Sequence, residues 1–209
     1  MNVFIPPEFS KDLLSLGIEL SHESQGTLFA YLELLQKWNQ SYNLTAITDF
    51  SEMVTHHLLD SLSIAPYLQG KRVLDVGTGA GFPGIPLALA YPDYKFVVLD
   101  SNGKKIRFIT QAIAELGIKN VFPVQERVEN FRDSEPFDDI ISRAVSDIST
   151  LMAQTQHHKH SETQWLLMKG TYPKEELSGF KMPYKVEKLS VPRLEAERHL
   201  VIVKEKFND

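Results

Sequence analysis

Residues 73–84 read VLDVGTGAGFPG, and this stretch decides the fold class that the sequence predicts. Its first four residues form a short, mainly apolar run, which is typical of a parallel strand buried on both faces. Four glycines follow within the next eight residues. Glycines at this spacing allow a sharp turn and let a ligand lie directly against the main chain. Residues 85–90 then predict a short helix with Pro86 in its first turn. Strand, glycine loop and helix in this order indicate a nucleotide-type cofactor site.

The chain after this loop alternates between strand and helix patterns, which predicts a parallel sheet. Strands are predicted at residues 73–76, 95–99, 121–124, 137–142 and 165–168. Helical patterns lie between them: one ends at Gly117, one covers about 147–156, and one is opened by Pro173. Two β-rich runs, 184–191 and 199–204, predict a terminal antiparallel pair. The expected fold is therefore α/β and Rossmann-like, a mostly parallel sheet with an antiparallel last strand.

The first 65 residues show helical periodicity and no strand pattern. Ser10 is expected to cap a short helix that ends at Gly17. A longer helix is expected over about 24–38, and Ser51 is expected to open a third. We therefore predict a helical cap over 1–65 and a cofactor-binding domain over 66–209, which together form one compact unit.

Composition restricts the class of protein. The 209 residues are 43% hydrophobic and 23% charged, as in an ordinary globular domain. The absence of cysteine excludes disulfides, a thiolate nucleophile and a cysteine-based zinc site. No apolar run is long enough to span a membrane and the first residues do not resemble a signal peptide, so we expect a cytoplasmic protein without a membrane partner. A net charge of −5 means that any contact with nucleic acid requires a local basic patch.

The glycine loop does not match the dinucleotide fingerprint, because Phe82 occupies the sixth position counted from Gly77. The observed pattern is D-x-G-x-G-x-G, with Asp75 as its acid and Gly79 as its second glycine. A carboxylate here would repel a pyrophosphate and attract a ligand with an ammonium group. Asp100 ends the next predicted strand, where it suits both hydroxyls of an adenosine ribose. These features indicate S-adenosylmethionine rather than NAD; the alternative is a tight turn with a solvent-facing aspartate.

Two later stretches are expected to complete the pocket. In residues 125–129 a polar side chain such as Glu129 can hold the adenine amino group while Val128 packs against its ring. The alternative for this stretch is a capped surface turn. Arg143 follows the fourth predicted strand, and the carboxyl ends of parallel strands border the ligand crevice. We therefore expect its side chain to point into the crevice.

The fourth strand also bears on the methyl acceptor. The Asn/Asp-Pro-Pro-aromatic turn typical of enzymes that methylate exocyclic amines is missing, and so is a cysteine for attack at pyrimidine C5. Ribose methylation commonly uses a Lys-Asp-Lys-Glu set with its aspartate at this turn, where this chain has Arg143. Guanine N7 presents a lone pair and needs no base, so alignment with the methyl group is the main requirement. We find no catalytic base, and Arg143 is the candidate for positioning the acceptor.

These features resemble a known family, the bacterial small-subunit ribosomal RNA guanine-N7 methyltransferases, called RsmG or GidB. The resemblance covers nearly the whole chain. It is carried by NLTAI (43–47), HHLLDSL (56–62), VLDVGTGAGFPGIPLA (73–88), LDSNGKKIRF (99–108), ERVENF (126–131), ISRAV (141–145), LMKG (167–170) and ERHLVIVK (197–204). Ala80 is a mild departure, because the family usually has proline or a similar small residue there.

The resemblance implies a class I methyltransferase fold and transfer of a methyl group from S-adenosylmethionine to N7 of a guanine in 16S ribosomal RNA. It implies cofactor contacts at Gly77, Phe82, Val128, Glu129 and Arg143. The RNA partner is expected within the small subunit or an assembly intermediate, which the negative charge of the chain favours, and no obligate protein partner is evident. A small-molecule methyltransferase and a non-enzymatic, cofactor-binding assembly factor remain alternatives.

Other polar residues have weaker signals. Lys104, Lys105 and Arg107 begin a predicted helix, where positive charge opposes the macrodipole; RNA phosphate contact or a solvated face would explain them. Lys169, at a predicted strand end, is a further RNA candidate.

Three histidines and one histidine–aspartate pair complete the candidates. His57 and Asp60, one helical turn apart, are expected to be packed polar neighbours rather than catalytic groups. His157, His158 and His160 are expected to lie in a flexible polar loop, since the motif contains no carboxylate to favour a metal. We therefore predict no metal site.

Overall fold

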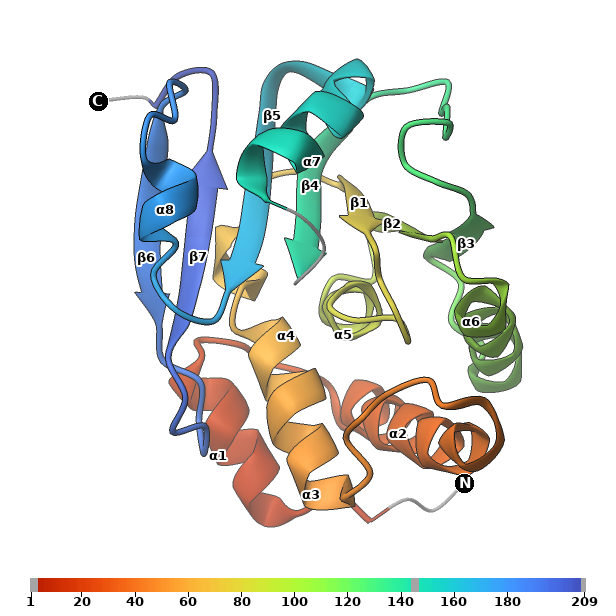
Figure 1. Ribbon diagram of the computed structural model, residues 1–209. Coiled ribbons are helices and arrows are strands. Elements are labelled where there is room, and N and C mark those ends of the chain that lie inside the picture. Colours follow the sequence, from red (N-terminus) through yellow and green to blue (C-terminus); the bar gives the residue numbers. More distant parts are fainter. Residues whose placement is uncertain (1–3, 144–146, 208–209) are drawn as a thin grey trace.

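The computed structural model describes residues 4–143 and 147–207. Its centre is a seven-stranded sheet in the order β3-β2-β1-β4-β5-β7-β6 (Figure 1). The strands are β1 (Arg72–Val76), β2 (Lys95–Asp100), β3 (Val121–Gln125), β4 (Phe137–Arg143), β5 (Lys159–Lys169), β6 (Tyr184–Leu189) and β7 (Arg198–Val203). β1 to β5 are mutually parallel, and β7 runs antiparallel to both β5 and β6. The predicted α/β fold with an antiparallel last strand is confirmed.

Two hydrophobic clusters cover the two faces of this sheet, because successive side chains of a strand point to opposite faces. Val73, Phe96 and Leu166 belong to the cluster shared with the N-terminal helices and with α5 (Gly84–Ala90) and α6 (Gly103–Leu116). Leu74 and Trp165 belong to the other cluster, together with side chains from the helices over that face. These helices are α7 (Ile148–Thr155) and α8 (Lys174–Leu177). Figure 1 shows them on the opposite side of the sheet from α5.

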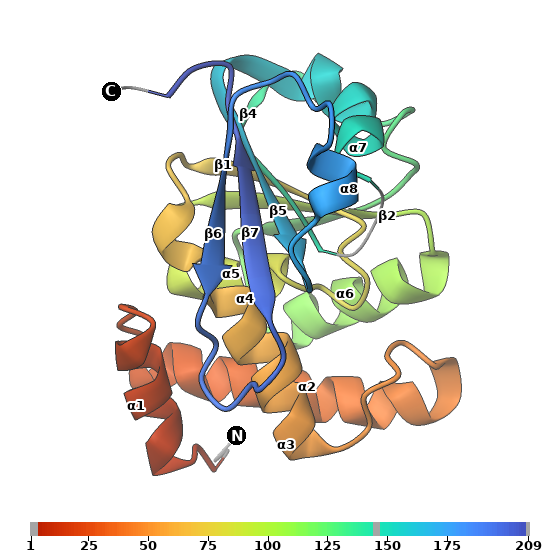
Figure 2. The same ribbon diagram turned by 60° about the vertical axis from the view of Figure 1, so that its left-hand side comes forward.

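The N-terminal segment is helical as predicted, and Figure 2 shows it below the sheet. It comprises α1 (Pro7–Ser15), α2 (His22–Tyr42), α3 (Phe50–Met53), a π-helical turn (Val54–Leu59), α4 (Asp60–Leu62) and a 3₁₀ turn (Ala65–Tyr67). Their apolar side chains belong to the same cluster as those of α5 and α6. The domain boundary after residue 65 stays a prediction, because this core is continuous across it.

Three helix starts differ from the sequence prediction. Ser10 lies inside α1, and its hydroxyl donates to Gln25 Oε1 at 3.0 Å instead of capping the helix. Ser21 caps α2, since its Oγ accepts the amide of Ser24. Asp49, not Ser51, caps α3 by accepting the amide of Glu52. For α2 and α3 the capping oxygen belongs to the residue just before the first turn, whereas α1 begins after Pro6 without a side-chain cap.

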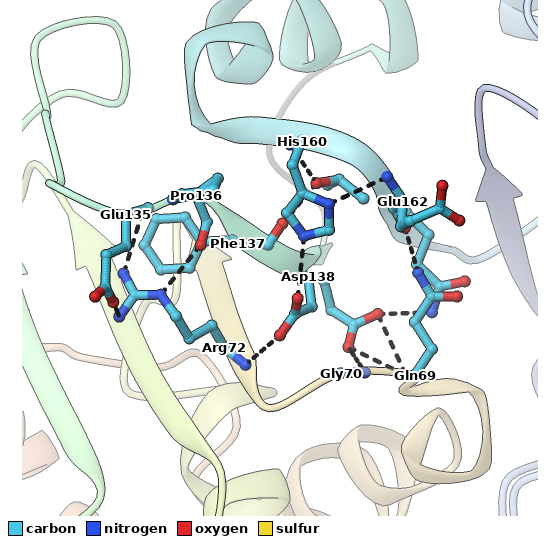
Figure 3. A network of polar contacts seen from close by, with 12 residues as sticks. Gln69, Gly70, Arg72, Glu135, Pro136, Phe137, Asp138, His160 and Glu162 are labelled. Atoms are coloured by element: carbon cyan, nitrogen blue, oxygen red, sulfur yellow. Dashed lines mark hydrogen bonds and ion pairs between the residues drawn. The ribbon is translucent and has the colours of Figure 1, made fainter.

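A polar network joins the amino ends of the parallel strands (Figure 3). The amide of Arg72 donates to Asp138 Oδ2 at 2.8 Å, and His160 Nε2 lies 3.0 Å from Asp138 Oδ1. Next to it, Asp139 accepts the amide of Gly70 at 3.0 Å, and burial raises the pKa of this carboxyl to about 6. The network ties the turn before β1 to β4 and β5, at the edge of the sheet opposite the carboxyl ends of the parallel strands.

The prediction that the three histidines lie in a flexible loop is wrong. His157 and His158 lie in a 3₁₀ turn (Gln156–His158), and His160 is already in β5. His158 is 2% exposed and packs against Phe131 and Phe137. Its pKa is lowered to about 4, first by burial and then by the neighbouring His157. These aromatic partners were not visible as neighbours in the sequence.

Ala144 and Val145 of the ISRAV motif lie outside the described residues.

Candidate functional site

A cavity of about 510 Å³ opens at the carboxyl ends of β1, β2 and β4. This is the edge at which parallel α/β sheets bind ligands. The cavity is lined by Leu44, Thr45, His57, Val76, Gly77, Thr78, Gly79, Ala80, Phe82, Leu99, Asp100, Ser101, Lys105, Glu126, Arg127, Val128, Glu129, Arg143 and Gln154. It thus unites all but one of the cofactor residues predicted from the sequence, and Asp75 is the exception.

The glycine loop forms the floor of this cavity. Gly79 has φ +62°, a left-handed conformation that favours glycine, and its amide donates to Asp100 Oδ2 at 2.9 Å. Gly81 has φ +90°, and a Cβ there would lie 2.4 Å from Tyr31 Oη. Tyr31 itself donates to the carbonyl of Ala80 at 2.8 Å. The second and third glycines are therefore required by backbone conformation and by the close approach of α2.

Asp75 supports the loop from beneath, which corrects its predicted place beside the ligand. The side chain is fully buried, and Oδ2 accepts Thr78 Oγ1 at 2.6 Å and the amide of Gly84 at 2.8 Å. Burial is the main cause that raises the pKa of this carboxyl to about 6. The carboxylate joins the start of the loop to the start of α5, so it cannot attract an ammonium group by direct contact.

Asp100 lies at the end of β2, on the cavity wall where the sequence placed it. Oδ2 accepts the amide of Gly79, and Oδ1 accepts the amide of Asn102 at 2.8 Å. Each carboxylate oxygen has a second acceptor site. Asp100 can therefore accept two ligand hydroxyls while it holds the loop in place.

The stretch after β3 forms the neighbouring wall. Val128 is 9% exposed and presents an apolar surface to the cavity. Glu129 is more exposed, and its Oε1 lies 3.8 Å from Arg127 Nη1. An apolar side chain next to an exposed carboxylate suits a heterocycle with an amino group at its edge.

Arg143 ends β4 and reaches the cavity, as predicted. Its Nη1 donates to the carbonyl of His56 at 2.9 Å and to Asp60 Oδ2 at 3.0 Å. Its guanidinium carbon lies 5.7 Å from the centre of the Phe82 ring, within the range of a cation–π contact. The cationic group is thus held between the N-terminal helices and the glycine loop.

His57 is a cavity residue that the sequence interpretation missed. Its ring stacks on Phe82, with centroids 4.6 Å apart, and Nε2 lies 3.0 Å from Thr45 Oγ1. The expected polar packing is present, but the partner is Thr45 and not Asp60, which binds arginines instead. Burial, followed by the charge of Arg143, lowers the pKa of His57 to about 3, so the imidazole is neutral at physiological pH. The one available signal was the NLTAI motif, which contains Thr45.

Comparison with known proteins identifies the family. A model of the GidB family, described as rRNA small subunit methyltransferase G, matches residues 24–201. The chain belongs to this GidB family. It is 53% identical to the ribosomal RNA small subunit methyltransferase G of Coxiella burnetii over 90% of this chain and 93% of the relative. It is 48% identical to the Legionella pneumophila protein of the same name over 92% and 94%, respectively.

Solved structures with a similar fold agree with a GidB-family methyltransferase. A SAM-dependent methyltransferase from Aquifex aeolicus superposes with a TM-score of 0.54 at 18% identity and covers 73% of this chain and 92% of its own. The plantazolicin methyltransferase BpumL, in complex with SAH, gives a TM-score of 0.56 at 15% identity over 86% and 96%. At these identities the similarity demonstrates the fold. The family match establishes the methyltransferase class, and the solved structures show that the fold is one that other methyltransferases share.

The cavity suits S-adenosylmethionine, the cofactor that the sequence predicts. Asp100 matches ribose hydroxyls, Val128 and Phe82 provide apolar walls, and Arg143 is a cationic donor for a carboxylate. Within residues 4–143 and 147–207, no three His, Cys, Asp or Glu side chains are grouped so that they would hold a metal ion. None of the helices in these ranges is long and apolar enough to cross a membrane.

The basic residues predicted to contact RNA are found in three environments. Lys105 lines the cavity, 3.9 Å from Asp100 Oδ2. Lys104 and Arg107 line an adjacent groove on α6. Lys169, at the end of β5, pairs with Glu176 at 2.8 Å and is not among the residues that line the cavity. The structure therefore places Lys104 and Arg107 in one groove and Lys105 in the neighbouring cavity, and Lys169 lines neither of them.

Proposed function

We propose that this chain transfers the methyl group of S-adenosylmethionine to N7 of a guanine in 16S ribosomal RNA. The observation that carries the proposal is the cavity at the carboxyl edge of the sheet, which collects the family's GTGxGFPG loop, Asp100 and Arg143 in one place. Membership of the GidB family supports the RNA of the small ribosomal subunit as the substrate.

The residues of the cavity have distinct roles in binding the cofactor. When bound, S-adenosylmethionine supplies an electrophilic methyl group on a positively charged sulfur. Asp100 accepts the ribose hydroxyls, while Val128 and Glu129 receive the adenine. The main chain of Gly77 and Gly79 lies against the ligand, which side chains at these positions would obstruct. Phe82 and Arg143 border the region left for the methyl acceptor.

The environments of His57 and Asp75 make both groups poor candidates for a catalytic base. His57 is the imidazole on the cavity wall, and a pKa of about 3 makes it a weak proton acceptor. Asp75 has no exposed surface and binds Thr78 and Gly84. Guanine N7 already carries a lone pair, so alignment of N7 with the methyl group supplies most of the rate enhancement. Arg143 is our candidate for orienting the acceptor.

A groove of about 730 Å³ beside the cavity supports the RNA contact. Lys104 and Arg107 line it, and the set of lining residues contains no carboxylate, although the whole chain has a net charge of −5. Trp38 also lines it and stacks on the 38%-exposed Tyr42, with ring centroids 5.1 Å apart. Basic groups beside an aromatic platform suit unpaired RNA, whose bases stack while cations bind the phosphates.

The test uses purified protein and radiolabelled cofactor in three reactions. The first contains naked 16S RNA, the second contains small subunits, and the third contains both together with an excess of small-molecule acceptors. Strand cleavage at N7-methylguanosine with borohydride and aniline then locates the product. We expect label at one guanine, with small subunits or their assembly intermediates as the better substrate. Label on small molecules alone would support the small-molecule alternative. Cofactor binding without any transfer would support the assembly-factor alternative, and either result would overturn the proposal.

A further inference from the structure

Asp60 lies between two arginines from distant parts of the chain. Its Oδ2 accepts Arg143 Nη1 at 3.0 Å, and its Oδ1 accepts Arg198 Nε at 2.8 Å. The Asp60 side chain is 3% exposed, whereas those of Arg143 and Arg198 are 22% and 21% exposed. A carboxylate this deeply buried requires charged partners, and here it has one on each oxygen.

The sheet topology explains why these residues meet. Arg143 is the last residue of β4, and Arg198 is the first residue of the antiparallel β7, so both lie at the edge of the sheet that opens into the cavity. β5 separates the two strands, and α4 lies below the arrowhead of β5 in Figure 1. Asp60 is the first residue of α4 and bridges the gap. The terminal hairpin is thereby coupled to the cofactor site.

The contacts of Arg143 leave part of its guanidinium available. Nη1 makes both hydrogen bonds, to Asp60 and to the carbonyl of His56. Nε and Nη2 donate to no residue in the described ranges 4–143 and 147–207, and the side chain lines the cavity. An arginine fixed through one nitrogen presents its remaining donors in a defined direction. Nε and Nη2 of Arg143 can therefore donate hydrogen bonds to an oxygen atom of a ligand.

Charge sharing gives Arg198 a distinct role. Two guanidinium groups and one carboxylate carry a net positive charge, so Asp60 fixes Arg143 without cancelling its field at the cavity. Without Arg198, Asp60 would neutralise Arg143 alone and could turn both oxygens toward it.

We propose that Asp60 and Arg198 are positioning residues of the methyltransferase site, with Arg198 acting on Arg143 through Asp60. The proposal rests on the proposed function for the identity of the RNA acceptor. The ligand oxygen that Arg143 binds has two sources, the carboxylate of the cofactor and the O6 of the guanine, and the two are separated by measurement. A cofactor contact changes the dissociation constant of S-adenosylmethionine, and a base contact changes KM for RNA or kcat.

The experiment compares Arg198→Gln, Arg198→Lys and Asp60→Asn by isothermal titration with S-adenosylhomocysteine, by steady-state methylation kinetics and by thermal melting. Glu197→Gln is the matched control, because Glu197 pairs with the exposed Lys188 and Arg198 uses only its backbone carbonyl. We expect Arg198→Gln to weaken cofactor binding or to lower kcat/KM about tenfold. Arg198→Lys should recover part of the loss, and Glu197→Gln should change neither quantity.

A double-substitution cycle tests the route through Arg143. In an Arg143→Lys background, Arg198→Gln should cause less than a twofold further loss, because the group that it positions is already changed. An equal loss in both backgrounds would overturn the proposal. A lower melting temperature with unchanged binding and kinetics would also overturn it, by showing a purely structural ion pair. Titration of the cofactor requires no RNA, and methylation of 16S RNA by the wild type tests the proposed function separately. A wild type that methylates 16S RNA, with variants that match it in binding and kinetics, would overturn this inference alone.

Discussion

The hydroxyl of Tyr31 donates a hydrogen bond to the carbonyl of Ala80 across 2.8 Å, linking the middle of α2 to the glycine loop. Tyr31 is fully buried, and its ring also contacts Phe82 edge-on, with centroids 5.9 Å apart. The N-terminal helices therefore support the cofactor site directly. His57, in the π-helical turn, and Thr45, in the loop between α2 and α3, also contribute to its wall.

Replacing Tyr31 tests whether its hydrogen bond to Ala80 supports the cofactor site. Tyr31→Phe leaves the buried carbonyl of Ala80 without its donor, so we expect a loss of about 1–3 kcal/mol in the free energy of unfolding. Urea denaturation measures the loss, and titration with S-adenosylmethionine should show weaker binding. Thr27→Ala, at a half-buried position of the same helix whose hydroxyl bonds to the carbonyl of Glu23, is the control. Unchanged cofactor affinity in a destabilised Tyr31→Phe would show that the contact only stabilises the fold.

Asp100 is expected to contribute to cofactor affinity in two ways. Asp100→Ala removes the acceptors for the ribose hydroxyls and for the amides of Gly79 and Asn102, so binding should weaken by at least ~1 kcal/mol. Isothermal titration provides the measurement. Asp93→Asn, in an exposed turn, serves as the control. Equal affinity for wild type and Asp100→Ala would remove Asp100 from the binding site.

His57 should make stability depend on pH. Its pKa is about 3 in the folded state, mainly because of burial, and about 6.5 when unfolded. Between these values the unfolded chain binds a proton that the folded chain does not, so stability falls as the pH decreases from about 6.5 toward 3. Above pH 6.5 the ring is neutral in both states and adds no pH dependence. His57→Gln should remove about one proton, roughly 1.4 kcal/mol per pH unit, from the slope between pH 4 and 6. Identical slopes in urea titrations of both proteins would contradict the burial of a neutral ring.

The basic groove on α6 should affect RNA binding without affecting the cofactor. Lys104→Glu and Arg107→Glu reverse charges that line this groove. We expect each to weaken binding of 16S RNA about fivefold or more and to lower the salt slope by about one. Filter binding at several salt concentrations gives both quantities. Lys119→Glu, exposed after the other end of α6, is the control. If all three variants bind RNA equally, the RNA lies elsewhere.

Local patterns were sufficient to predict the strands, the glycine loop and the positions of Asp100, Val128 and Arg143 at strand ends. A strand or a turn depends mostly on adjacent residues, and the topology of a parallel sheet places strand ends at one edge. The helix starts were less reliable, because α1 begins after Pro6 without a side-chain cap and Asp49, rather than Ser51, precedes the first turn of α3.

The sequence by itself determined the α/β fold and predicted the cofactor class, since these follow from the spacing of glycines and apolar residues along the chain, and its motifs carried the resemblance to the family. Only the tertiary structure decided that Asp75 is buried beneath the loop, that His57 is a neutral wall of the cavity, and that Asp60 joins two arginines. Asp60 meets partners 83 and 138 residues away. The environment of such a side chain depends on which distant segments pack around it, and burial then determines its charge.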